Sequence, residues 1–344
     1  AALGGQENAF TSRDYTGYYQ QIPANRLEDV MRLESDRFAN NFWPDSEFKK
    51  EIEVIKEERR MRTDDNPRAG LMEQLNAATW VASPYHRPVV GWMSDLDSMK
   101  PDDARQFHQA WYVPENAEVV SAGDVDVAQV RQLAEKYYGS IEKRALPERK
   151  PRPEPLQKGM RRIEYKAPAE QAYVLMNFKV PDLHNLVEPQ ASDKDAMALM
   201  MLSQVLSGYD GARLDRRLTQ GPGRVADAAF SGASVVARGP STFMLGGVPS
   251  QGKTAKDVEA ALRAEVARIA KDGVSETELA RVRTQWQAST VYERDSVFGQ
   301  ANDLGSNWVL GLPLDTNDRL LALLKTVTTA QGQDVAPRYF RGVR

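Results

Sequence analysis

Apolar residues at three-and-four spacing, typical of amphipathic helices, dominate the first part of the chain. This spacing predicts a helix over residues 25–41 and, after the break at Pro44, a second helix over 47–62. A segment rich in Phe, Thr and Tyr, residues 8–21, predicts a strand. Further elements are expected as helices up to about residue 81, from Pro101 and over 127–138, and as a short apolar strand over 117–122.

Residues 145–159 interrupt this pattern with four prolines and many charges, which predicts an extended linker. Beyond the linker the order repeats, with strands expected near 161–165 and 172–180 and then helices, strands and long helices. No short period recurs along the chain, so a solenoid is excluded. The pattern predicts an α+β fold with domains at 1–144 and 160–344 joined by the linker.

Composition narrows the function classes. A length of 344 residues suggests two domains, and a formal charge of −3 gives no footprint for nucleic acid or an anionic membrane. No apolar run is long enough to span a bilayer. The absence of cysteine removes disulfides, thiolate zinc sites and cysteine nucleophiles, which fits the cytoplasm or an exported bacterial protein. Neither a GxxxxGK[ST] nor a GxGxxG phosphate loop occurs, so a nucleotide enzyme has no support.

The helix expected over residues 48–62 carries an unusual pair of carboxylates. On a wheel of about 100° per residue its apolar side chains form one broad arc, and Glu51 and Glu58 fall inside that arc. An unpaired buried charge is costly, so both carboxylates call for a partner. Seven residues place their Cα atoms about 10 Å apart, so one metal ion could take only one of them as a ligand. The alternative is that both pair with arginines such as Arg59 or Arg62.

Several segments resemble the pitrilysin/insulinase-type zinc metallopeptidases, in their bacterial processing-peptidase-like branch. ALGGQENAFTSRDYTGYYQ from Ala2 resembles the strand that follows the family's zinc-binding helix, and EIEVIKEERRMR resembles its third-ligand helix. SPYHRPVVGW, WYVPENAEVVSAGDVD, DKDAMALMMLSQVLSG and VYERDSVFGQA continue the match over nearly the whole chain. The resemblance implies two homologous domains, each a mainly antiparallel sheet packed with helices, that form half of a clamshell.

The resemblance also assigns roles. It implies Glu58 as a zinc ligand and Glu51 as a supporting carboxylate. Asn8, Ala9, Phe10 and Thr11 would form an edge strand to which a peptide substrate adds as a further strand, although the same residues could simply complete the sheet.

The family's HxxEH motif, whose two His bind Zn²⁺ and whose Glu is the general base, is absent from this sequence. The histidines present, His86, His108 and His184, are far apart and are interpreted as surface or packing residues. We therefore expect the motif, with the general base, a few tens of residues before Ala1. The chain as given is expected to bind zinc weakly and to be inactive. Many bacterial relatives are exported, which favours the periplasm, with the cytoplasm as the alternative.

Active family members also supply an Arg and a Tyr, seven residues apart, from their second half. The corresponding segment here, Arg217 to Phe230, has no Tyr, and Ala226 or Asp227 takes its place. The resemblance thus implies a zinc endopeptidase subunit that cleaves peptides or unfolded segments beside a homologous partner with the Arg/Tyr pair, or as a homodimer. The alternative is a non-catalytic structural or peptide-binding subunit.

Overall fold

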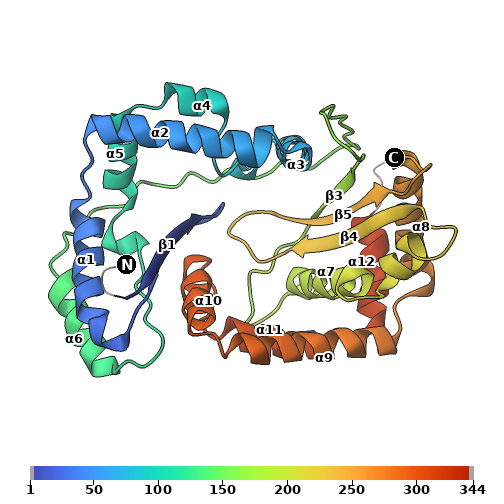
Figure 1. Ribbon diagram of the computed structural model, residues 1–344. Coiled ribbons are helices and arrows are strands. Elements are labelled where there is room, and N and C mark those ends of the chain that lie inside the picture. The colour runs from blue at the N-terminus through green and yellow to red at the C-terminus, as the bar shows by residue number, and fades with distance from the viewer. Residues whose placement is uncertain (1–3, 341–344) are drawn as a thin grey trace. The chain divides into compact units, whose positions relative to one another are not determined.

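The computed structural model describes residues 4–340 (Figure 1), so Ala2 and Leu3 of the family-like segment lie outside the described residues. Contacts divide the chain into two compact units, each built from stretches that are distant in sequence. Unit 1 comprises Ala1–Arg62, Arg87–Pro151 and Glu293–Val309; unit 2 comprises Thr63–His86, Arg152–Tyr292 and Leu310–Arg344. The division of the sequence into homologous domains 1–144 and 160–344 around a linker stays a prediction.

Unit 1 contains a β-hairpin and six helices. Strands β1 (Gln6–Thr11) and β2 (Thr16–Gln21) pair antiparallel, with Phe10 opposite Gly17. A Cβ atom at Gly17 would lie only 2.5 Å from the Phe10 ring, so this glycine lets the ring cross its neighbouring strand. The helices are α1 (Leu27–Asn40), α2 (Asp45–Arg59), α4 (Met93–Ser98), α5 (Pro101–Trp111), α6 (Val127–Tyr138) and α10 (Val297–Val309). Short 3-10 turns lie at Ala24–Arg26 and Pro114–Asn116, and a π-helical turn, Arg60–Asp64, follows α2.

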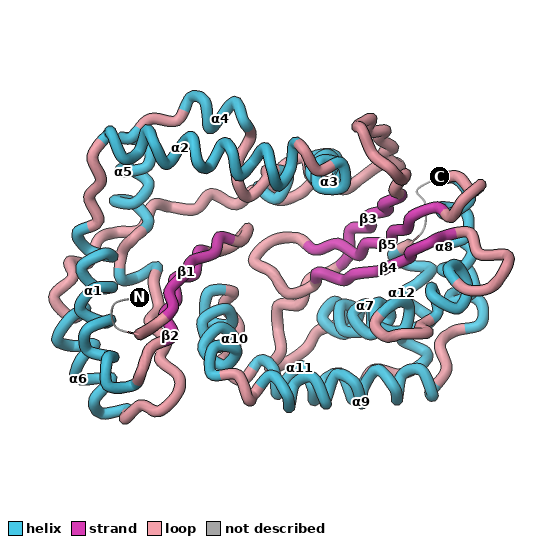
Figure 2. Tube along the Cα trace, viewed as in Figure 1, coloured by secondary structure: helices cyan, strands magenta, loops and turns pink. Residues whose placement is uncertain are grey.

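Unit 2 is built on a three-stranded antiparallel sheet in the order β3-β5-β4, from strands β3 (Val174–Val180), β4 (Ala226–Ser234) and β5 (Ser241–Pro249) (Figure 2). Helix α7 contacts β4, helix α8 contacts β5, and α12 packs against both helices. The helices are α3 (Pro67–Thr79), α7 (Ala191–Ser207), α8 (Ala255–Asp272), α9 (Glu276–Glu293), α11 (Thr316–Thr326) and α12 (Thr329–Tyr339), with a 3-10 turn at Pro84–His86 and a π-helical turn at Asp215–Thr219.

The two units differ in how much apolar surface they bury. The main hydrophobic core lies in unit 2, where α7 is buried on most of its faces and Phe243 and Phe340 meet edge to face at 4.7 Å. In the described part of unit 1, the buried apolar side chains are few: Met31, Ile52, Leu96, Val113 and Leu133. Unit 1 exposes several large apolar side chains instead, including Phe42, Val54 and Met61.

Most of the expected elements are present, and two strands are not. The predicted strand over 8–21 is the β1–β2 hairpin, and the 25–41, 47–62 and 127–138 helices correspond to α1, α2 and α6. The prediction of strands over residues 117–122 and 161–165 is wrong, since neither segment pairs with another strand among the described residues. Arg161 and Arg162 hold the second segment through side-chain bonds to Ala78 O and Glu259 instead.

The α+β class is confirmed. Helices and strands mix along the chain, and both sheets of the described residues are antiparallel. Residues 145–159 form neither helix nor strand, as their prolines predict.

Candidate functional site

Helix α2, which carries Glu51 and Glu58, is stabilised along its exposed surface by ion pairs at i,i+3 spacing. Glu47 pairs with Lys50, and Glu53 pairs with Lys56, each at 2.8 Å. Asp45 and Glu47 lie in the first turn, and basic residues lie in the last turn, as the helix dipole favours. These local pairs explain why so charged a segment is helical.

Only one side of the predicted apolar arc of α2 is buried. Ile52 and Arg59 face the interior, and Arg59 donates to the carbonyl oxygen of Gly91 at 2.8 Å. Val54 and Met61 are 57% and 62% exposed. The expectation that Glu51 and Glu58 lie on a buried face is therefore wrong for the described residues. Helix α2 packs against the rest of unit 1 through the side that carries Ile52, and the side that carries the two carboxylates stays open.

Glu51, Val54 and Glu58 of α2 and Met61 of the π-helical turn that follows it form one strip, which we call the open face. Glu58 is partly exposed and pairs with Arg62 at 2.7 Å, as the arginine alternative foresaw for one of the two carboxylates. Glu51 is exposed and makes no ion pair within residues 4–340. Along the open face two carboxylates, about two turns apart, therefore alternate with two exposed apolar side chains.

The described residues do not fit a zinc ion by themselves. Among residues 4–340 no group of three or more His, Asp or Glu side chains could hold a metal. His86 Nδ1 lies 2.7 Å from Ser83 O, and His184 Nε2 lies 2.9 Å from Asp182, so both rings have local partners far from α2 in sequence. Glu58 is one possible ligand, whereas a stable zinc site in a protein takes three or four.

Strand β1 presents a free edge. Asn8, Ala9 and Thr11 are exposed, while Phe10 is partly buried against Tyr15 at 5.4 Å between ring centroids. Within the described residues β1 pairs with β2 alone. The structure therefore brings the four predicted substrate-binding residues together on a strand able to accept another strand.

The register of the hairpin tells which backbone groups point to this edge. The Ser12 N–H donates to Tyr15 O at 2.8 Å, so Ser12 and Tyr15 form a hydrogen-bonded pair. Such pairs recur at every second residue of an antiparallel ladder, so Phe10 and Asn8 also bond to β2. The N–H groups of Ala9 and Thr11 then point away from β2. The Ala9 N–H accordingly donates to the side-chain oxygen Oδ1 of the preceding residue, Asn8, at 2.8 Å.

The segment expected to carry an Arg/Tyr pair begins in the π-helical turn Asp215–Thr219 and ends in strand β4. Arg217 is exposed there. Arg224 pairs with Asp227 at 3.2 Å, so it already has a carboxylate partner.

Comparison with known proteins defines the class. Residues 98–286 match the family model described as the peptidase M16 inactive domain, and residues 1–91 match that of the insulinase family, peptidase family M16. The chain therefore belongs to peptidase family M16. The match to the inactive-domain model covers more than half of the chain and both compact units.

Three known proteins illustrate what the chain is similar to. The zinc protease PqqE of Helicobacter pylori is 28% identical over 299 residues, which cover 86% of this chain but only 65% of that relative. The crystal structure of a protease from Helicobacter pylori superposes with a TM-score of 0.90 at 25% identity, covering 99% of this chain and 80% of that chain. The first half of the periplasmic protease PqqL from Escherichia coli has a TM-score of 0.78 at 20% identity, covering 98% and 73%, which shows the shared fold.

Within the part of the chain that the structure describes, no helix is both long and apolar enough to cross a membrane.

Proposed function

We propose that the full-length protein is a zinc-dependent endopeptidase subunit that cleaves peptides or unfolded segments. In this proposal Glu58 is a zinc ligand, Glu51 is the carboxylate that supports it, and residues Asn8 to Thr11 bind the substrate. In the same proposal, two histidines and a general base from outside residues 1–344 complete the zinc site, since these residues contain no HxxEH motif. The name of the Helicobacter relative, a zinc protease, supports the class, and family membership supports the assignment of the two carboxylates.

The open face of α2 is the observation that carries this proposal. Exposed apolar residues at Val54 and Met61 favour burial beneath another segment. A segment that covered them would also enclose Glu51, which has no ion-pair partner within residues 4–340, and Glu58, which has Arg62. Two enclosed carboxylates with a single arginine leave one negative charge that needs a further cation to offset the loss of hydration. A metal ion held jointly by α2 and the covering segment meets that need.

Substitution of the two carboxylates in the full-length protein tests the assignment. We expect Glu58→Gln to abolish zinc retention after dialysis, because a neutral amide is a poor zinc ligand. We expect Glu51→Gln to keep most of the zinc and to lower peptide hydrolysis by about 10–100-fold, as changes to groups that support a ligand typically do. Glu57→Gln is the matched control, since Glu57 is an exposed carboxylate of the same helix that pairs with Arg60.

Metal analysis and a quenched peptide substrate give the two readouts. Complete zinc loss in both Glu51→Gln and Glu58→Gln would contradict the division of roles. Full zinc content in Glu58→Gln would show that the third zinc ligand is a residue other than Glu58.

A second candidate is a non-catalytic structural or peptide-binding subunit. The description of the model matched by residues 98–286, an inactive domain, favours it. A wild-type full-length protein that binds no zinc and hydrolyses no peptide, alone or with a homologous subunit, would establish this second function. The cellular compartment is proposed from similarity as well. The periplasmic protease PqqL, a structural neighbour, supports a periplasmic location, with the cytoplasm as the alternative.

A further inference from the structure

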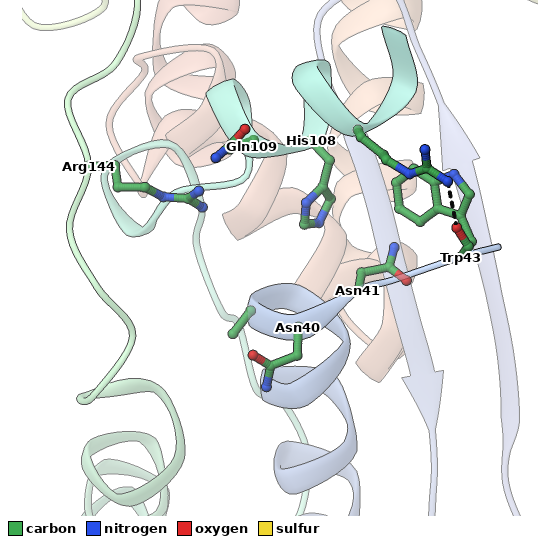
Figure 3. Close-up of a pocket in the computed structure, with 8 residues that line it drawn as sticks. Asn40, Asn41, Trp43, His108, Gln109 and Arg144 are labelled. Carbon is green, nitrogen blue, oxygen red and sulfur yellow. Dashed lines mark hydrogen bonds between the residues drawn. The ribbon is translucent and has the colours of Figure 1, made fainter. Parts of the chain in front are cut away.

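A pocket of about 310 Å³ lies in unit 1, where the C-terminal end of α1 meets α5 and the loop that follows α6 (Figure 3). Its lining includes Asn41, Trp43, Arg105, His108, Gln109 and Arg144. Figure 3 shows the guanidinium group of Arg144 directed toward the imidazole ring of His108 across the pocket. None of these residues belongs to the proposed peptidase site.

The two arginines of the pocket differ in charge compensation. Arg105 pairs with Asp102 at 2.8 Å and with Asp45, and it also donates to the carbonyl oxygen of Trp43 at 3.1 Å. Arg144 donates to the carbonyl oxygen of Tyr112 at 3.0 Å, and no carboxylate of residues 4–340 lies within ion-pair distance of it. Arg144 is therefore the uncompensated cation of the pocket.

His108 adds a polar atom without a partner. Its ring stacks on Tyr112 with 4.4 Å between centroids, and its Nε2 atom, which is closed off from solvent, has no hydrogen-bond partner within residues 4–340. Burial lowers the pKa of His108, and the nearby charges of Arg144 and Arg37 lower it further. The lowered pKa disfavours the imidazolium form, so His108 lines the pocket as an aromatic ring and does not favour a second positive charge there.

Neutral hydrogen-bonding groups complete the lining. The side-chain amides of Asn41 and Gln109 make no hydrogen bond to the other described residues, so each has donors and an acceptor to offer a ligand. Trp43 supplies an aromatic wall whose ring meets the His108 ring nearly at right angles. The pocket combines one free positive charge, amides and an aromatic surface at the lower end of the usual volume range for small-ligand sites.

We propose that this pocket binds a carboxylate, with Arg144 as the counter-ion, Asn41 and Gln109 as orienting groups and the His108 ring as part of the wall. One uncompensated guanidinium balances one negative charge, and its planar fork matches the two oxygens of a carboxylate. A phosphate dianion would leave a charge unbalanced. The carboxylate belongs either to the C-terminus of a peptide or to a small free acid, and the amides suit both.

Calorimetric titration of the full-length protein distinguishes these sources. The probes are N-acetyl-alanyl-alanine, the same dipeptide with a C-terminal amide, propionate as a small free monocarboxylate, and inorganic phosphate. We expect the dipeptide acid to bind and its amide to bind at least about tenfold more weakly, because the amide loses the charge-assisted bond to Arg144. Tighter binding of propionate than of the dipeptide acid would assign the pocket to small free acids.

Variants locate the binding. We expect Arg144→Gln to weaken the dipeptide acid about tenfold or more, and Arg144→Lys to recover part of the affinity, since lysine keeps the charge and loses the fork. Arg131→Gln is the control, because Arg131 is an exposed arginine of α6 that already pairs with Glu135 at 3.0 Å. The side-chain NMR signals of His108 report whether the ligand enters the pocket.

Three results would overturn the proposal. They are equal binding of the acid and the amide, unchanged affinity in Arg144→Gln with a native circular dichroism spectrum, and a bound ligand that leaves the His108 signals unmoved. Absence of binding by the dipeptide acid, propionate and inorganic phosphate alike would also overturn it. Phosphate binding tighter than that of both carboxylates would show that the pocket takes a different anion.

Discussion

Glu154 shows how a single residue fixes part of the segment expected as a linker. Its carboxylate accepts hydrogen bonds from the backbone N–H groups of Val81, Ala82 and Ser83 at 2.9–3.1 Å, and from Lys179 Nζ at 2.7 Å. Burial of the carboxylate opposes ionisation, but the bonds from Lys179 and the backbone outweigh it and lower the pKa to about 2. The segment is therefore anchored to unit 2 at Glu154.

We expect Glu154→Gln to lower the free energy of unfolding by about 2–3 kcal/mol at pH 7, because a neutral amide cannot replace a carboxylate that is bonded to four donors. A pKa lowered by folding gives stability that is present above the unfolded value near 4.5 and is lost as pH falls toward 2. The difference between wild type and variant should therefore shrink over that range.

Urea unfolding at several pH values measures this difference. Glu164→Gln is the control, since Glu164 is exposed and lies 3.8 Å from its partner Lys166. A difference between wild type and Glu154→Gln that stays constant from pH 7 to pH 2 would show that the ionised carboxylate is not responsible.

At the scale of the element, helix α2 marks the limit of what periodicity reveals. The apolar arc predicted the helix and its ends to within a few residues. It could not tell which half of the arc is buried, since Ile52 and Val54 are equally apolar but contact different surroundings. Burial depends on which segments lie against the helix, and those come from distant parts of the chain.

We expect Ile52→Ala to destabilise the chain of residues 1–344 by about 2–4 kcal/mol, because Ile52 is only 8% exposed. Val54→Ala should cost less than about 0.5 kcal/mol in the same chain, since Val54 is 57% exposed. Denaturant unfolding measures both. Equal losses would mean that the open face of α2 is covered within this chain.

The strands show the same limit. Residues 8–21 have a strand-like composition, but the turn at Ser12 to Tyr15 that divides them into a hairpin lacks the usual Asn-Gly signal. Residues 117–122 are apolar enough for a strand, yet a strand also requires a partner, which composition does not reveal. The pocket around Arg144 had no sequence signal, because its residues come from three separated stretches without a recognisable spacing.

A proline at the free edge of β1 tests substrate binding. We expect Ala9→Pro to lower kcat/KM for an extended peptide by about tenfold in the active full-length protein, because the Ala9 N–H points away from β2 and the proline ring removes it. Stability should change little, since the ladder to β2 does not use this group.

Two matched changes control for other effects. Ala9→Val keeps the N–H and should retain activity. Phe10→Pro removes a ladder bond and should destabilise the hairpin, as urea unfolding would show. Wild-type kcat/KM in Ala9→Pro would exclude strand addition at this edge.

At the scale of the whole molecule, the segment from Arg217 to Phe230 bears on the proposed need for a second subunit. It has no Tyr, and Arg224 is already paired with Asp227. We expect the full-length subunit alone to hydrolyse peptides about 10²–10³-fold more slowly than with a homologous subunit that brings an Arg/Tyr pair, as loss of one oxyanion donor typically costs.

Assays of the isolated subunit with and without the product of an adjacent homologous gene measure this effect. Arg217→Ala, in the exposed arginine of the segment, tests whether this residue substitutes for the pair. Full turnover by the subunit alone, unchanged by the partner, would show that a homodimer or the single chain suffices.

The interleaving of the two compact units has a consequence for synthesis on the ribosome. The chain enters unit 2 at Thr63, long before the sheet of that unit has been made, and it returns to unit 1 for Glu293–Val309. Helix α3 must therefore wait, as a nascent segment, for strand β3, which is translated about a hundred residues later. Unit 1 is not complete until Val309 has been made, and unit 2 also needs residues from Leu310 onward, so neither unit can fold fully before most of the chain is translated. A single proteolytic cut cannot release either unit as an intact fragment, because each consists of separate stretches.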